Sequence, residues 1–175
     1  MVDESADDLD NAVIAAEDDW TPPTFADGEV SEEQGMEAKG EAAEAAANGE
    51  FDKAVAAYSK ALAVAPSALT YAKRAETLLK LGRPTAALKD CTVALEMNPD
   101  SAKTYKVAAK ALAKKGQWQG AYDKLCTANK IDEDDDSRLL QKQLKAKCDK
   151  VKKIEELRAK RAQAAAEEEK PVDVA

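Results

Sequence analysis

Seven side chains of this 175-residue sequence have the chemistry to bind an acidic protein partner. Six are lysine or arginine, whose cationic groups bind carboxylates, and the seventh is a tyrosine. Most lie at helical spacing on two segments that we expect to line one side of a helical array. The set consists of Lys39, Lys73, Arg74, Lys103, Tyr105, Lys106 and Lys110. The alternative interpretation is an ordinary solvated helix face.

The residue types that enzymes and metal sites need are largely missing. The sequence has no histidine, the commonest general base and metal ligand, and it has no glycine-rich phosphate loop or nucleophile elbow. Carboxylates occur in runs such as 132–136, which are typical of helix caps and linkers. The three cysteines, Cys91, Cys126 and Cys148, lack metal-ligand spacing. We therefore predict reduced packing thiols and no catalytic residues, metal or cofactor.

Composition and charge narrow the class of protein further. Aromatic residues make up only 5%, which leaves too little bulk for a sandwich or barrel core, whereas abundant alanine suits close-packed helices. A net charge of -8 argues against a nucleic acid partner. No apolar run has the length of a membrane span, and the acidic N-terminus resembles neither a signal nor a transit peptide. We expect a cytoplasmic protein of one domain or two small ones.

The stretch 71–99 contains the most informative local pattern. Apolar residues recur every three or four positions on both sides of a turn, which predicts two helices. Gly82 supplies the permissive backbone that ends the first helix, and Pro84 suits the first position of the second. Asn98-Pro99 then ends the unit, because a residue that precedes proline is pushed out of helical geometry.

The same pattern recurs upstream with a shift of 33 residues and downstream with a shift of 34. Gly49 and Gly116 correspond to Gly82, and Tyr105 corresponds to Tyr71. A period of about 34 with small residues at fixed places in two helices is the tetratricopeptide signature. We therefore predict an all-α solenoid of three helix-turn-helix repeats over residues 31–132. Ser31 and Gln34 fit a capping box at its start.

Both ends of the sequence differ from the repeats. Residues 1–33 hold twelve acidic residues and no lysine or arginine, so we predict a disordered acidic tail over 1–30. Two short apolar islands interrupt it, the stretch 9–14 with Leu9, Val13 and Ile14, and the pair Trp20 and Phe25. They are either scattered residues of a linker or a motif that orders against a partner or against the repeats.

A long helix is predicted after the third repeat, over 133–169, followed by a disordered end at 170–175. Its apolar stripe, Leu140, Leu144, Cys148, Val151 and Ile154, should cover repeat three, because a repeat array needs a cap. Ten basic and three acidic residues between 137 and 162 make this helix strongly positive. Its positive surface is either a solubilising face or a contact for acidic groups.

The run from Tyr71 to Lys106 resembles the middle repeat of Hip, the heat shock protein 70 interacting protein family. Gly116-Gln-Trp118 and the acidic run 130–136 are similar to the third repeat of that family and the segment after it. The resemblance implies a cochaperone that binds the ATPase domain of 70-kDa heat shock chaperones and favours their ADP-bound state. The family's dimerisation and client-binding regions are not visible, which leaves a second hypothesis: a structural subunit or assembly factor within a larger complex.

Other tetratricopeptide cochaperones hold the C-terminal carboxylate of a chaperone with five clamp residues. Lys39 and Lys103 stand where two of the clamp lysines would be. The two asparagine positions hold Ala43 and Lys73, and the last basic position holds Val107. We therefore expect weak capture of a terminal carboxylate, since its amide donors and one cation are absent.

Overall fold

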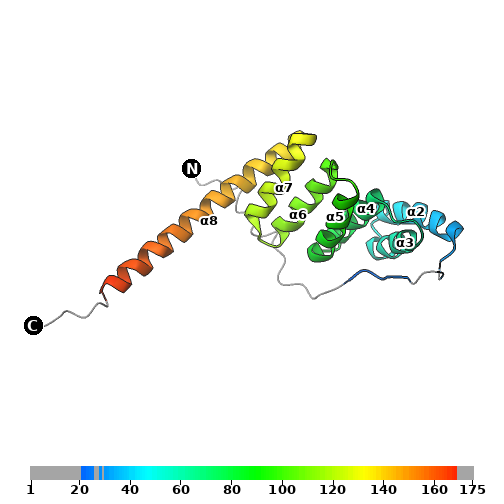
Figure 1. Cartoon of the computed structure of the whole chain (residues 1–175), viewed down its shortest axis with the longest axis horizontal. Coiled ribbons are helices and arrows are strands. Elements are labelled where there is room, and N and C mark those ends of the chain that lie inside the picture. The colour runs from blue at the N-terminus through cyan, green and yellow to red at the C-terminus, as the bar shows by residue number, and fades with distance from the viewer. Residues whose placement is uncertain (1–20, 26–27, 29, 169–175) are drawn as a thin grey trace, which may run out of the picture.

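The computed structural model describes residues 21–25, 28 and 30–168 of the chain, and the regular secondary structure of the described part consists of helices alone (Figure 1). This confirms the predicted all-α repeat solenoid. Trp20, the predicted end at 170–175 and, of the predicted tail at 1–30, residues 1–20, 26–27 and 29 lie outside the described residues. In chain order the helices are α2 (Glu32–Ala47), α3 (Phe51–Val64), α4 (Ala68–Lys80), α5 (Pro84–Met97), α6 (Ala102–Lys114), α7 (Trp118–Ile131) and α8 (Asp135–Glu168).

The sequence period is repeated in the backbone. Each hairpin turns at a glycine with positive φ, namely Gly49 at 78°, Gly82 at 73° and Gly116 at 71°. This left-handed conformation is readily accessible only to glycine, so these three positions end the first helix of each pair. The capping box is also present, because the Ser31 hydroxyl accepts from the Gln34 amide at 3.3 Å and the Gln34 side chain accepts from the Ser31 amide at 3.0 Å.

Alanine dominates the contacts between helices. Fully buried alanines occur on every helix from α2 to α7, so neighbouring backbones approach closely. Only a few large side chains are completely enclosed, chiefly Leu78, Leu125, Leu144 and Val55. The core is therefore a series of thin layers between successive helices, as expected for a repeat array in which each unit contacts its neighbours.

Helix α8 covers the last repeat and then extends past it (Figure 1). Leu144 is fully buried against α6 and α7, and Cys148 is nearly so. Ile154 is 48% exposed and Leu157 50%, which corrects the prediction that Ile154 covers repeat three. The apolar stripe continues in the sequence, but the repeats end before it does. No helix in the described ranges has the length and apolar character of a membrane span.

Candidate partner-binding groove

The first helix of each repeat contributes to a groove along one side of the array. Alanines of α2, including Ala43, form one wall, and Lys73, Glu76 and Lys80 of α4 form the floor. Lys103 of α6 closes the other wall, around a cavity of about 280 Å³. The small side chains on α2 leave space for a partner, and the lysines on α4 and α6 supply positive charge. The groove therefore suits an acidic surface or segment of another protein.

The cations of this groove differ in how far their charge is compensated. Lys103 forms an ion pair with Glu76 at 3.0 Å, and the Lys80 ammonium lies 5.6 Å from the centroid of the Phe51 ring. Lys73 is half-buried and has no ion pair with any residue in the described part of the chain. Its ammonium group is thus the cation that most needs a partner carboxylate.

Arg74 does not belong to this surface, although the sequence analysis placed it there. Its side chain is 9% exposed and lies between helices. Two guanidinium nitrogens donate to the two carboxylate oxygens of Asp90, each at 2.7 Å, and a third donates to the Ser59 hydroxyl at 2.9 Å. Arg74 therefore joins α3, α4 and α5 inside the array, and this corrects the prediction that it contacts a partner.

Lys106 and Tyr105 also have contacts within the chain. The Lys106 ammonium donates to the Asp134 carboxylate at 2.7 Å, and its side chain is only 16% exposed. That bond, together with bonds from the backbone and hydroxyl of Ser137, lowers the pKa of Asp134 to about 2. Tyr105 packs into the cluster between α6 and α8, with the Lys124 ammonium 5.5 Å from its ring centroid. Lys106 therefore holds the junction before α8, whereas Tyr105 packs among α6, α7 and α8.

Lys39 and Lys110 remain as exposed cations. Neither forms an ion pair with a residue that the structure describes. Lys110 follows Lys103 by seven positions, two turns of α6, so the two share a helix face. Lys39 lies one turn before Ala43 on α2. Of the seven predicted binding residues, Lys73 and Lys103 line the cavity itself, and Lys39 and Lys110 extend its positive surface.

Phe25 of the predicted tail motif lies against a different surface. It is half-buried beside Val30, Gln34 and Ala38 of the α2 region and Lys60 of α3. Nine positions, or two and a half turns, separate Gln34 from Ala43 and Ala38 from Ala47 on α2. Phe25 therefore contacts the side of α2 that faces away from the groove. Of the two interpretations of the tail residues, Phe25 thus fits contact with the repeats, on a surface other than the groove.

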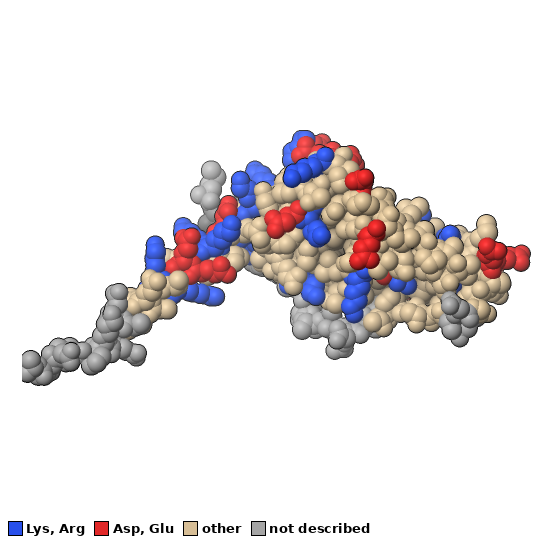
Figure 2. All heavy atoms as spheres, viewed as in Figure 1, with Lys and Arg blue, Asp and Glu red and all other residues tan. Residues whose placement is uncertain are grey.

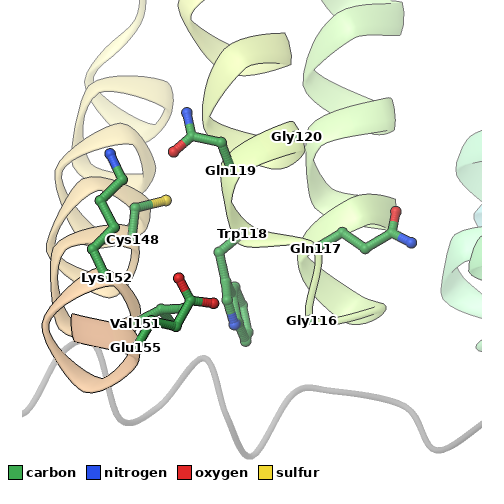
Figure 3. A pocket seen from close by; sticks show the side chains of 9 residues that line it. All are labelled: Gly116, Gln117, Trp118, Gln119, Gly120, Cys148, Val151, Lys152 and Glu155. Carbon is green, nitrogen blue, oxygen red and sulfur yellow. The ribbon is translucent and has the colours of Figure 1, made fainter. Parts of the chain in front are cut away.

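A second cavity, which the sequence analysis missed, lies between the start of α7 and α8 (Figure 3). Its volume is about 440 Å³, and Trp118, Cys148 and Val151 provide its apolar lining. The only signal in the sequence is a tryptophan between two glycines, Gly116 and Gly120. The repeat pattern predicts an ordinary packing role for that tryptophan. The cavity could not be predicted from the pattern, because α8 forms its second side.

The described residues contain no cluster of side chains suited to holding a metal ion. Burial raises the pKa of the Cys91 thiol to about 12, with the Asp90 charge as a smaller cause. That thiol is therefore protonated at neutral pH and is a packing group. What the described groove supplies is a shaped, positively charged surface for binding.

Comparisons with known proteins agree with this geometry. The tetratricopeptide repeat family model matches residues 39–102 and 72–133. A TPR repeat-containing thioredoxin of Arabidopsis thaliana is 38% identical over 163 residues, which cover 90% of this chain and 42% of that protein. Hsc70-interacting protein 1 of Drosophila melanogaster is 37% identical over 129 residues, which cover 73% of this chain and 33% of that protein. The chain thus spans less than half the length of these relatives.

Solved structures show the same architecture. The TPR2B domain of yeast Sti1, in its complex with pHsp70, superposes with a TM-score of 0.61 at 25% identity. That match covers 65% of this chain and 98% of the domain. The Sgt2 TPR domain of Aspergillus fumigatus superposes with a TM-score of 0.59 at 20% identity over 86% of this chain and 94% of that domain. The second match supports the fold alone.

Proposed function

Because this chain belongs to the tetratricopeptide repeat family and is a protein-interaction module, we propose that its groove binds the ATPase domain of a 70-kDa heat shock chaperone. The observation that best supports this proposal is the position of Lys73. This lysine has no counter-ion among the described residues and lies in a groove that alanines line on one side. The similarity to an Hsc70-interacting protein supports the choice of partner. The three free cysteines suit a reducing compartment, so we propose that binding takes place in the cytoplasm.

The residues of the groove favour a folded acidic surface over a free C-terminus. A terminal carboxylate needs several converging donors to compensate its desolvation. Ala43 offers no side-chain donor, and Val107 is buried and apolar. Lys73, by contrast, can pair with a side-chain carboxylate on a protein surface, and Lys103, which pairs with Glu76, adds positive charge beside it. The groove therefore suits side-chain carboxylates that are spread over a domain.

The test is calorimetric titration of the isolated ATPase domain, in the presence of ADP, with three forms of the full chain. Lys73→Glu should weaken binding about tenfold or more, because the partner carboxylates meet like charge. Lys89→Glu is the matched control, since Lys89 is exposed on α5 and does not line the groove. It makes the same change in net charge and should leave the affinity nearly unchanged.

Two results would overturn this proposal. Equal weakening by both variants would mean that only net charge matters and that the groove is not the site. Tighter binding of a peptide from the C-terminus of the chaperone than of its ATPase domain would mean that the groove recognises a free carboxylate.

A second candidate function is that of a structural subunit or assembly factor. The observation that favours it is the match to the thioredoxin relative, which covers 90% of this chain, so the same repeats accompany a different kind of protein. Affinity purification of the native protein, with and without ADP, separates the two. ADP-dependent recovery of a 70-kDa chaperone supports the first function. A stable, nucleotide-independent set of other subunits supports the second.

A further inference from the structure

The cavity between α7 and α8 has the form of a docking site for an apolar side chain. In Figure 3 the indole of Trp118 lies beside Val151 and Glu155, while the side chain of Gln117 points away from them. Cys148 completes the apolar part, and Lys152 and Glu155 place charges at its edge. Trp118 is half-buried, so part of its indole stays accessible from the cavity.

The surroundings of this cavity are strongly positive. Helix α8 carries ten basic and three acidic residues between 137 and 162, and Figure 2 shows blue side chains gathered along it with a smaller red group among them. The Lys147 ammonium lies 5.2 Å from the centroid of the Trp118 ring. Beyond the repeats, Ile154 and Leu157 are about half exposed. A ligand for this surface should therefore combine acidic groups with a few apolar ones.

Residues 1–20 of the same chain have this composition. They carry eight carboxylate side chains and no lysine or arginine, and their apolar residues include Leu9, Val13, Ile14 and Trp20. Figure 1 shows the described segment 21–25 running back from the start of α2 beneath the repeats, toward the centre of the array. Twelve residues separate position 21 from position 9, and an extended chain of that length spans up to about 40 Å. That is the width of about four packed helices at 8–10 Å spacing.

We propose that residues 1–20 dock on the α7–α8 cavity of their own chain, with an apolar side chain against Trp118 and carboxylates beside Lys152 and its basic neighbours. The surface that the segment occupies is then distinct from the groove. A partner can therefore bind in the groove while the N-terminal segment stays docked on α7 and α8. The proposal is independent of the chaperone as partner, because it concerns another face of the array.

The first experiment uses tryptophan fluorescence of the full chain. The chain has two tryptophans, so Trp20→Phe leaves Trp118 as the only reporter and keeps an apolar ring in the segment. Acrylamide quenching is compared at about 0.01 M and about 1 M salt, which shortens the Debye length from about 30 Å to about 3 Å. We expect quenching of Trp118 to rise about twofold at high salt, because screening releases the segment. Unchanged quenching would overturn the proposal.

Two further variants, made in that background, separate the cavity from general charge. Lys152 lines the cavity, and Lys145 is exposed on the same helix outside it. Lys152→Glu should raise quenching at low salt to the high-salt level, whereas Lys145→Glu, with the same change in net charge, should leave it low. Equal effects of the two variants would overturn docking at the cavity.

Zero-length carbodiimide cross-linking of the unmodified chain then locates the segment. We expect carboxylates of residues 1–20 to couple chiefly to Lys150, Lys152 and Lys153. Coupling chiefly to Lys73 and Lys103 would place the segment in the groove and overturn the proposal. Mixing ¹⁴N- and ¹⁵N-labelled chains identifies cross-links between copies, and a predominance of those would overturn docking within one chain.

Discussion

At the scale of single residues, cations that look alike in the sequence have different tasks in the fold. Lys73 and Arg74 are adjacent, yet Lys73 lines the groove and Arg74 is buried in an ion pair with Asp90. The difference follows from their angular positions, since adjacent residues of a helix point about 100° apart at 3.6 residues per turn. The Arg74 guanidinium is planar and can bond to both oxygens of one carboxylate while also reaching Ser59.

Removing one partner of this buried pair should strongly destabilise the repeats. Arg74→Met leaves the Asp90 carboxylate buried without its cation, which costs about 3–5 kcal/mol of unfolding free energy. Urea denaturation measures this value, and Lys73→Met is the matched control with an expected change within about 0.5 kcal/mol. The double variant Arg74→Met with Asp90→Leu should recover part of the loss. Equal costs for the two methionine variants would mean that the pair is not an energetic link between the helices.

At the scale of helices, two glycines of α2 occupy opposite environments. Gly35 is buried against α3, and a Cβ atom placed there would lie 2.7 Å from the Cβ of Val64. Gly40 has open space where its Cβ would be. The first glycine therefore sets the close approach of α2 to α3, while the second only lowers the helix propensity of its segment.

Alanine substitution should separate these two roles. Gly35→Ala forces the helices apart and should lower the unfolding free energy by about 1–3 kcal/mol, reduced by the better helix propensity of alanine. Gly40→Ala makes the same chemical change without a clash and should raise stability by up to about 1 kcal/mol. Thermal unfolding followed by circular dichroism measures both. A stabilising Gly35→Ala would mean that α2 and α3 can separate at little cost.

At the scale of the whole molecule, each repeat packs on its neighbours in sequence, and α8 covers the last repeat. Such arrays have stability that sums over repeats and interfaces, so a terminal unit loses protection first when its cap is weakened. Leu144 supplies the fully buried contact of α8 with α6 and α7, and Lys106 fixes the start of α8 through Asp134. The rest of α8 projects beyond the repeats (Figure 1).

Truncating the buried leucine should therefore affect one end of the array most. Leu144→Ala should cost about 2–5 kcal/mol, as for other buried leucines. Amide hydrogen exchange should show the loss of protection in α7 and the first half of α8 before α2 and α3. Leu157→Ala, at a half-exposed leucine of the same helix, is the control and should change stability by less than about 0.5 kcal/mol. Uniform loss of protection across all helices would mean that the array unfolds as a single unit.

The sequence by itself determined the local structure of this protein, because its strongest signals are local. Gly49, Gly82 and Gly116 mark the turns through the conformation that only glycine adopts readily, and their spacing alone predicts three stacked hairpins. The capping box at Ser31 and the start of the second repeat's second helix at Pro84 were predictable for the same reason. Each depends on residues within one turn of one another.

Only the tertiary structure decided which cations face a partner. Lys73, Arg74 and Lys106 have similar sequence signals, but contacts with Asp90 and Asp134, 16 and 28 residues away, neutralise two of them. Likewise, Ile154 continues the apolar stripe of α8, yet the repeats end before it, and Trp118 lines a cavity only because α8 crosses it. Helical periodicity states which side chains share a face. Which residues that face contacts depends on where segments distant in the sequence lie and end. A local sequence pattern holds no information about those positions.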